Sequence, residues 1–289
     1  MVGRPSVGKS TIVNAFVGQK VAIVSDKPQT TRNRILGILT KPEAQVIFVD
    51  VPGIHRPMHK LGERMVEAAV SAVPNADLVL FVVDATTPPL EEDALAARLL
   101  SEKARVPVIL ALNKADCLPL ERVKRSFEAY QALGQFADWI MVSATRGDNM
   151  DKLLAMTIAR LPLGPRYYPE DQVTDVAERF VAAELVREQV LRLLRQEVPH
   201  AVAVVVEEFK ERREGLVYIS ATVYVEKESQ KAIVIGAGGA MLKQIGAAAR
   251  EAIELELGSK VFLELWVKVR PKWRRDEAWL RQVGYQAQT

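Results

Sequence analysis

GRPSVGKS is the most informative stretch of this sequence; it comprises Gly3, Arg4, Pro5, Ser6, Val7, Gly8, Lys9 and Ser10, and Thr11 follows it. The stretch fits G-x-x-x-x-G-K-[ST], a glycine-containing loop that leads into a helix. Backbone N–H groups of such a loop surround phosphates, because glycines allow close approach. Lys9 is expected to reach the β- and γ-phosphates, and the Ser10 hydroxyl to hold Mg²⁺. Residues 3–11 are therefore predicted to bind nucleotide phosphates.

A second nucleotide signature follows an apolar run. Residues 46–49 (VIFV) have the pattern of a buried strand, and the residues after them are Asp50, Val51, Pro52, Gly53 and Ile54. An aspartate at the carboxyl end of a strand binds Mg²⁺ through water in phosphate-loop enzymes. Gly53 is expected to offer its N–H to a γ-phosphate and to act as a hinge. Residues 50–54 are therefore predicted to form a nucleotide-sensing segment.

The third signature is Asn113-Lys114-Ala115-Asp116, which follows the apolar residues 107–112. The Asp116 carboxylate would accept hydrogen bonds from guanine N1–H and the exocyclic amine, a donor pair that adenine lacks. Asn113 would fix the loop, and the Lys114 stem would cover one face of the base. Ser143 and Ala144, which follow another apolar run, would supply N–H groups to guanine O6. The predicted nucleotide is therefore a guanine nucleotide.

The first half of the chain alternates strand-like and helical patterns. The expected strands are residues 34–40, 45–49, 78–83, 107–112 and 139–142, and the expected helices are 9–17, 61–73, 89–104, 119–133 and 149–160. Apolar strands separated by helices indicate a mostly parallel sheet covered on both faces. A turn at Lys41-Pro42 favours an antiparallel hairpin at one edge.

The predicted domain, residues 1–160, carries only Met1 and Val2 before the phosphate loop. Such a loop normally follows a buried central strand. We therefore expect the domain to lack most of its first strand, and a natural start upstream of Met1 is the simplest explanation.

Proline and glycine at 161–172 predict a linker, and residues 173–289 then read helix, strand, strand, helix, helix, strand and a tail helix. The expected strands are 201–206, 216–225 and 261–269, with the polar residues 207–214 joining the first two. This order indicates an α+β domain.

A glycine-rich turn between the two central helices suggests RNA binding. It comprises Ile235, Gly236, Ala237, Gly238 and Gly239, with Lys231 and Lys243 on either side. A G-x-x-G loop clamps the backbone of single-stranded RNA, although the same glycines also serve as a simple helix–helix turn. Ile235, Leu242 and Ile245 are expected either to line a base-binding groove or to form the helix core.

Residues 260–275 carry six cationic side chains against Glu264 alone. Lys268, Arg270 and Lys272 are the expected phosphate contacts, and Trp266 and Trp273 are expected to offer stacking surfaces. A half-buried strand with a solvated basic end is the plainer alternative.

The composition of the chain excludes several classes of protein. The 39 Lys+Arg and 36 Asp+Glu give a net charge of +3, which excludes a highly basic nucleic-acid coat. A single cysteine, Cys117, cannot form an internal disulfide and indicates a reducing compartment. The apolar run 78–83 is far shorter than the ~18 residues of a membrane span, and no signal peptide opens the chain.

The order of the three signatures resembles the TRAFAC class of GTPases. In that class a threonine between the phosphate loop and Asp50 binds Mg²⁺ in the GTP state. The corresponding residues here are Gln29, Thr30, Thr31, Arg32 and Asn33. We assign the threonine to Thr31, with Thr30 as second choice, so the predicted metal set is Ser10, Thr31 and, through water, Asp50.

Across nearly its whole length the chain resembles the Era family of bacterial ribosome-assembly GTPases. The most specific segments are 28–34, 231–245 (KAIVIGAGGAMLKQI), 263–272 (LELWVKVRPK) and Gly284-Tyr285. The resemblance implies a G domain followed by a type II KH domain. It also implies slow hydrolysis of GTP to GDP and binding to 16S ribosomal RNA near its 3′ end during 30S subunit assembly. It further implies a monomer in the cytoplasm, with peripheral association at the inner face of the plasma membrane.

Ser6 departs from the family pattern, and Ile54 departs from a pattern found in many other GTPases. Ser6 stands where members carry an asparagine that helps to bind K⁺ in related GTPases, and the shorter side chain predicts weak potassium stimulation. Ile54 follows Gly53 where many GTPases have a glutamine that orients water, which predicts slow turnover. His55 and His59 are expected to be exposed loop residues.

Two other functions fit parts of the sequence. One is a KH RNA-binding module whose G domain does not hydrolyse GTP. The other is an ATP-using phosphate-loop enzyme, which the sequence at 113–116 disfavours.

Overall fold

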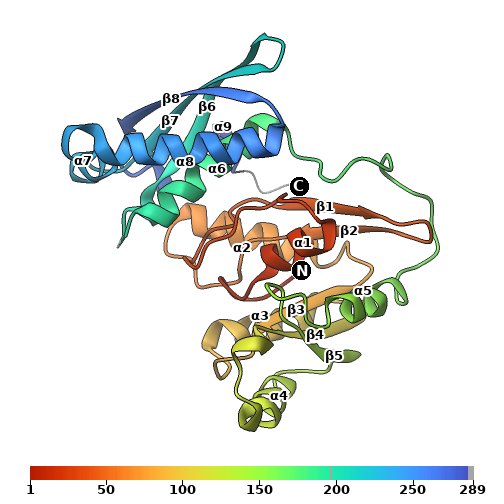
Figure 1. The fold of residues 1–289 in the computed structure, drawn as a ribbon. Coiled ribbons are helices and arrows are strands. Elements are labelled where there is room, and N and C mark those ends of the chain that lie inside the picture. Colours follow the sequence, from red (N-terminus) through yellow and green to blue (C-terminus); the bar gives the residue numbers. More distant parts are fainter. Residues whose placement is uncertain (196, 286–289) are drawn as a thin grey trace. The chain divides into compact units, whose positions relative to one another are not determined.

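The computed structural model describes residues 1–195 and 197–285 (Figure 1). Its contacts divide the chain into two compact units, residues 1–175 together with Tyr285, and residues 176–284. The predicted linker, 161–172, belongs to the first unit. Residues 196 and 286–289 of the predicted second domain lie outside the described residues.

The described residues of the first unit form two sheets. β1 (Ile35–Thr40) and β2 (Gln45–Asp50) form an antiparallel hairpin, and β3 (Val79–Asp84), β4 (Val108–Asn113) and β5 (Asp138–Met141) form a parallel sheet. The helices are α1 (Lys9–Val17), α2 (Lys60–Ala72), α3 (Glu91–Lys103), α4 (Val123–Gln131) and α5 (Met150–Ile158). The predicted antiparallel hairpin and parallel strands are confirmed, but the hairpin forms a sheet of its own and not an edge of the parallel sheet.

Helices cover both faces of the parallel sheet because its strands are apolar at nearly every position. In β3, Leu80 and Val82 join a core with Phe16 of α1, whereas Phe81 and Val83 join a second core with Leu100 of α3. Successive side chains of a strand point to opposite faces. One strand therefore supplies both cores, and the polar residues fall at the strand ends.

Few backbone hydrogen bonds join the two sheets of this unit. Val2 forms a parallel bridge with Phe81: its N–H donates to Leu80 O (2.9 Å), and its carbonyl accepts from Val82 N–H (2.8 Å). The Met1 amino group donates to Val49 O (2.6 Å). Burial lowers the pKa of that amino group to about 6.

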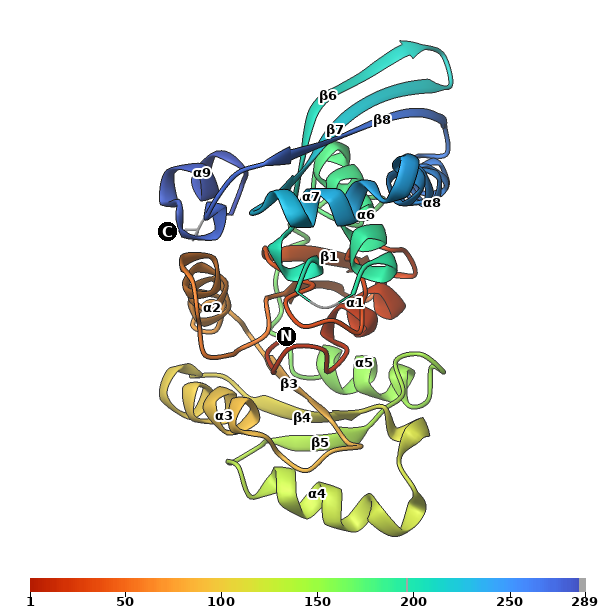
Figure 2. The same cartoon turned by 90° about the vertical axis from the view of Figure 1, so that its left-hand side faces the viewer.

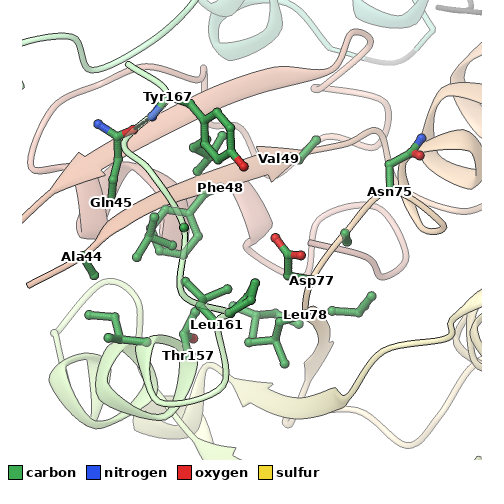
Figure 3. Close-up of a pocket in the computed structure, with 18 of the residues that line it drawn as sticks. Ala44, Gln45, Phe48, Val49, Asn75, Asp77, Leu78, Thr157, Leu161 and Tyr167 are labelled. Atoms are coloured by element: carbon green, nitrogen blue, oxygen red, sulfur yellow. Dashed lines mark hydrogen bonds between the residues drawn. The ribbon is translucent and has the colours of Figure 1, made fainter. Parts of the chain in front are cut away.

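Beyond Met1 a cavity of about 610 Å³ separates β2 from β3 (Figure 3). Its walls include Phe48, Val49, Asp77, Leu78 and Leu161. The β2 and β3 edges that face the cavity do not pair with each other. The first unit is thus two sheets with a seam between them.

The segment predicted as a linker packs along the β1–β2 hairpin. The N–H groups of Tyr167 and Tyr168 donate to Gln45 Oε1 (2.8 and 3.0 Å). Further on, Ile38 N–H donates to Val173 O (2.8 Å). These bonds fix residues 167–173 on the first unit.

Among its described residues, the second unit has three strands and four α-helices. They are α6 (Glu178–Leu193), β6 (Ala203–Arg213), β7 (Leu216–Val225), α7 (Glu228–Ile235), α8 (Ala240–Leu257), β8 (Lys260–Val269) and α9 (Glu277–Gln282). β7 lies in the middle, antiparallel to β6 and parallel to β8. The predicted order of elements is confirmed.

The prediction that residues 207–214 form a polar connection was wrong. β6 continues to Arg213 and pairs with β7, for example through Glu208 with Ser220 and Lys210 with Tyr218. The polar sequence lacks the alternation of a half-buried strand because this part of the hairpin extends beyond the helices (Figure 2). Short 3₁₀ turns complete the chain: η1 (Ala115–Cys117), η2 (Leu120–Arg122), η3 (Pro199–Ala201), η4 (Ala237–Gly239) and η5 (Trp273–Arg275).

Candidate functional site

Three glycines of the phosphate-loop region lie where no side chain fits. A Cβ added to Gly3 would stand 2.1 Å from Val82 O, and one added to Gly8 would stand 2.2 Å from Asn113 Nδ2. A Cβ on Gly53 would stand 2.4 Å from the Pro5 nitrogen. The loop therefore packs against β3, the end of β4 and the residues after β2 at once.

Lys9 is buried inside the loop that it follows. Its ammonium donates to Gly3 O (3.2 Å) and Arg4 O (3.0 Å). Burial lowers the pKa of Lys9 to about 8, although the Asp50 carboxylate opposes the shift. An anion bound in the loop would stabilise the charged form of this lysine.

Ser10, Thr31 and Asp50 meet beside Lys9. Ser10 Oγ lies 2.9 Å from Thr31 Oγ1 and donates to Asp50 Oδ2 at 2.5 Å. Asp50 Oδ1 is buried and has no hydrogen-bond partner among the described residues. Burial raises the pKa of Asp50, and the nearby Lys9 opposes that shift. Thr30, the second choice, instead donates to Lys27 O (2.6 Å).

These groups face a cavity of about 260 Å³. It is lined by Pro5, Ser6, Gly8, Lys9, Ser10, Thr11, Ile23, Val24, Ser25, Asp26, Gln29, Thr30, Thr31, Gly53 and Lys114. The cavity thus brings together the loop, residues 29–31, Gly53 and the lysine of the third signature.

Two predicted loop residues direct their side chains elsewhere. Val7 is in the core, and the Arg4 guanidinium donates to Asp93 Oδ2 and Thr87 Oγ1, both at 3.1 Å. Asp93, which sequence reasoning missed, also accepts the Leu90 N–H at the start of α3 (2.9 Å). The acidic first turn of α3 signals such a cap, but not its contact with the phosphate loop.

Asn113 ties two loops together. Its Nδ2 donates to Val7 O (2.8 Å), and its Oδ1 accepts from Ala144 N–H (3.0 Å). This arrangement places the buried Ser143 near Asp116, and a hydrogen bond from the Ser143 hydroxyl holds the pKa of Asp116 below its usual value. Asp116 is therefore an exposed carboxylate acceptor.

Lys114 adopts a left-handed backbone conformation with φ 65°. Its Nζ donates to Asp84 Oδ2 (2.7 Å) at the end of β3. Asp84, a second residue that sequence reasoning missed, thus positions the lysine. The order of β3 and β4 could have signalled it, because parallel strands end at the same edge.

The prediction that His55 is exposed was wrong. His55 is 9% exposed, and its Nδ1 lies 2.8 Å from Gly53 O. Because a carbonyl only accepts, Nδ1 is the donor in this contact, and Nε2 lies 3.4 Å from Gln29 Nε2. The ring therefore links two predicted nucleotide-sensing segments. His59 is partly exposed.

The remaining residues of these segments are mostly buried. Val51, Pro52 and Ile54 lie inside the unit, and Asn33 is partly exposed. Arg32 is 3% exposed, and its Nη1 donates to the Tyr285 hydroxyl at 3.4 Å.

In the second unit, the glycine-rich turn has a left-handed backbone. Gly236, Gly238 and Gly239 have φ values of 73°, 57° and 81°. Ala237 and Gly238 are exposed, Lys243 is exposed, and Lys231 and Ile235 are partly exposed. The turn thus presents bare backbone with lysines on both sides.

Two apolar candidates for RNA contact are core residues. Ile245 is fully buried, so it does not line a groove. Trp273 is also fully buried, and its indole N–H donates to Ala201 O (2.9 Å). The expectation that Trp273 stacks on bases was wrong, because the packing of η5 buries its ring in the interior of the unit.

The basic segment is less charged locally than its sequence indicates. Arg270 pairs with Asp276 at 2.8 Å, Lys260 pairs with Glu254 at 3.2 Å, and Arg274 pairs with Glu226. Lys268 and Lys272 are exposed, and no described residue forms an ion pair with either.

Comparison with known proteins identifies similar chains for both units. A family model described as a 50S ribosome-binding GTPase matches residues 1–114, and a KH domain model matches residues 197–274. GTPase Era of Geobacter metallireducens is 50% identical over 286 residues, covering 99% of this chain and 96% of the relative. GTPase Era of Geotalea uraniireducens is 47% identical over 286 residues, which again cover 99% of this chain and 96% of the relative.

Two solved structures share this fold closely. One is Era in complex with MgGDPNP and nucleotides 1506–1542 of 16S ribosomal RNA; it has a TM-score of 0.94, 40% identity, and coverage of 98% of this chain and 96% of that one. The other is a variant of Aquifex aeolicus Era bound to GDP and AlF₄⁻, with a TM-score of 0.92, 39% identity, and coverage of 98% and 97%.

Proposed function

This chain belongs to the Era family of GTPases, and on that premise we propose that it binds GTP, hydrolyses it slowly to GDP and phosphate, and binds 16S ribosomal RNA near its 3′ end to assist assembly of the 30S subunit. The observation that carries the GTPase proposal is the meeting of Ser10, Thr31 and Asp50 beside the buried Lys9.

The residues present fit a magnesium ion bound together with nucleotide phosphates. Asp50 Oδ1 is a buried oxygen without a partner among the described residues, and two hydroxyls lie next to its carboxylate. We assign Ser10 and Thr31 as direct ligands and Asp50 as a ligand through water. When bound, the ion neutralises charge that develops on the phosphate oxygens.

The chain's own residues then position the nucleotide. The loop N–H groups and the Lys9 ammonium hold the phosphates, and the Gly53 N–H meets the γ-phosphate. Asp116 selects guanine, Asn113 and Ala144 fix that loop, and the Lys114 stem covers the base.

Hydrolysis has little side-chain assistance in this chain. Ile54 is fully buried, and the His55 ring is occupied by contacts with Gly53 and Gln29. The proposed rate enhancement therefore comes from Lys9, the metal and backbone N–H groups, which supports slow turnover.

The RNA site that we propose centres on the turn 236–239. Lys231, Ile235, Lys243, Lys268 and Lys272 surround or extend it, whereas Arg270 is held by Asp276 and contributes less. The neighbouring structure with nucleotides 1506–1542 of 16S ribosomal RNA supports this assignment.

A single titration tests both activities. Labelled GTP and ATP are added to the full chain, with and without the RNA fragment 1506–1542, and bound nucleotide and released phosphate are measured. Tighter binding of GTP than of ATP, with slow release of phosphate, supports the proposal. GTP binding without any phosphate release would favour the non-hydrolysing RNA-binding module, and ATP preference would contradict the guanine site.

We also propose that the protein is a cytoplasmic monomer that associates peripherally with the inner face of the plasma membrane, as the family resemblance implies. Among the described residues, no single helix is long and apolar enough to cross a membrane, and only the bent pair formed by α7 with residues 237–257 passes on length and composition. Sedimentation with anionic vesicles tests the association, and light scattering tests the monomer.

A further inference from the structure

One face of the sheet in the second unit is left uncovered by α6, α7 and α8, although α9 packs on one end of it, where the Trp279 and Tyr224 ring centroids lie 5.3 Å apart. Figure 2 shows α6, α7 and α8 on one side of β6, β7 and β8. Val261 and Val267 of β8 are buried toward that side, and Leu265 Cδ1 lies 3.5 Å from where a Cβ on Gly246 of α8 would stand. Alternate residues of β8 therefore point to the other face, which we call the open face.

The open face exposes two large aromatic side chains. Phe262 is 56% exposed and Trp266 is 54% exposed, four residues apart on the same strand. At 3.3 Å per residue, their Cα atoms are roughly 13 Å apart. Exposed apolar side chains that gather on one face, rather than being scattered singly, mark interaction sites.

A second aromatic and an arginine support Phe262 from the neighbouring strands. The Tyr218 ring stacks on Phe262 with centroids 5.9 Å apart, and the Arg212 guanidinium lies 3.8 Å above the Tyr218 ring. The Tyr218 hydroxyl donates to Glu264 (2.6 Å), which holds that carboxylate between the two exposed rings. Phe262 thus packs against Tyr218 and remains more than half exposed.

Cationic side chains accompany the rings. Lys268 follows Trp266 on the same face and is exposed, and Arg212 stands at the far end. Neither forms an ion pair with a described residue. Lys210 is paired with Glu208 at 2.6 Å.

We propose that the open face binds unpaired nucleotides, with one base stacked on Phe262, another on Trp266, and phosphates near Arg212 and Lys268. Exposed rings flanked by cations are what single-stranded nucleic acid requires, because every base has a π-face and every linkage a negative charge. Aromatic side chains on a sheet stack bases in the same way in other RNA-binding modules.

The proposal rests on the RNA-binding function argued above and adds a second contact surface to it. The turn 236–239 joins α7 to α8 and therefore belongs to the helical side of the sheet. One RNA strand that reaches both surfaces would pass around the edge formed by β8.

The test uses the full chain and the RNA fragment 1506–1542 as probe. The double variant Phe262→Ala with Trp266→Ala removes both rings, and Leu255→Ala, which truncates a side chain that is 87% exposed on α8, is the matched control. Phe262→Tyr with Trp266→Phe keeps the stacking surfaces. Gly238→Asp disturbs the turn at a position with φ 57° and open space, which aspartate tolerates.

Loss of one stacked base weakens binding by roughly tenfold or more. We expect the double alanine variant to bind at least tenfold more weakly, the aromatic variant and Leu255→Ala to bind like the parent chain, and the loss to add to that of Gly238→Asp. Ultraviolet crosslinking should join the RNA to the peptide 260–268. Circular dichroism checks that the double variant is folded.

If Gly238→Asp weakens binding while the double alanine variant does not, the open face is not an RNA surface and the proposed function stands. If the parent chain does not bind the fragment at all, both proposals fail. If the double variant instead loses binding to a protein partner with RNA affinity unchanged, the face is a protein interface and the proposal is overturned.

Discussion

The Arg32 guanidinium donates a hydrogen bond to the Tyr285 hydroxyl (3.4 Å) and lies 5.9 Å from the centre of the tyrosine ring. The chain leaves the second unit at Gly284 and rejoins the first at Tyr285. Both side chains are buried. A residue near the carboxyl end therefore holds the segment proposed to sense the γ-phosphate.

Tyr285→Ala should loosen that segment. The substitution exposes the Arg32 guanidinium and removes a buried aromatic contact, so amide exchange of residues 29–33 should accelerate by at least tenfold. Tyr285→Phe, which keeps the ring, should change exchange by less. Hydrogen–deuterium exchange of the nucleotide-free protein measures both, and equal exchange in all three chains would contradict the holding role.

The two adjacent threonines should differ sharply in their effect on turnover. Thr31→Val removes a hydroxyl that meets Ser10 and the proposed metal, so GTP turnover at limiting Mg²⁺ should fall by at least 100-fold. Thr30→Val is the matched control, because it loses the bond from the Thr30 hydroxyl to Lys27 O, worth about 1 kcal/mol of stability. If the two losses were equal or reversed, the metal assignment would move to Thr30.

The stability of the nucleotide-free protein should rise with pH above about 8. The pKa of Lys9 is lowered from 10.5 to about 8 by folding, so between these values the unfolded chain binds the extra proton. Stability increases with pH wherever the unfolded state binds more protons. At 1.36 kcal/mol per pKa unit, the full change is up to roughly 3 kcal/mol.

Denaturant unfolding between pH 7 and 10 measures this change, with Lys9→Met as the control. The difference in free energy of unfolding between the two chains should shrink as pH rises. A difference that is constant over this range would rule out the buried cation as its source. Added GDP should oppose the effect, because its phosphates stabilise the ammonium.

Potassium should stimulate this protein weakly. Ser6 Oγ donates to Asp26 O (3.2 Å) and reaches less far than the asparagine that the family resemblance leads us to expect there. Ser6→Asn should therefore raise the ratio of turnover in K⁺ to that in Na⁺ several-fold. Phosphate release in the two salts measures it, and equal ratios in both chains would refute the idea.

His55 should matter more for folding than for chemistry. His55→Ala leaves the Gly53 carbonyl without its partner, so it should cost about 1–3 kcal/mol of stability and reduce turnover moderately. A thousandfold loss of turnover in a chain that remains folded would instead make His55 a catalytic residue. Thermal unfolding and single-turnover assays separate the two effects.

The elements and the nucleotide signatures were predictable because their patterns are local. Apolar runs gave the strands, and the order of Lys9, Asp50 and Asp116 indicated which edge of the sheet holds the ligand. The burial of His55 and Trp273 was not predictable, because it depends on contacts with residues far along the chain.

Charge was the least predictable property. The sequence shows six cations at 260–275, but three of them are neutralised by Glu226, Glu254 and Asp276 from other elements or turns. Similarly, no local signal shows that Arg4 turns away from the phosphates to meet Asp93. Only the packing of α3 on the phosphate loop determines that contact.

The seam between β2 and β3 determines which contacts hold the first unit together. The hairpin β1–β2 carries Asp50 at its end, whereas the parallel sheet β3–β5 carries the guanine-binding loops, and among the described residues Val2 is bridged to β3. Phe48 of the hairpin shares one core with Leu80 and Val82 of β3. Side-chain packing, more than backbone pairing, therefore sets where the carboxylate proposed to bind metal stands relative to the loops proposed to bind the base.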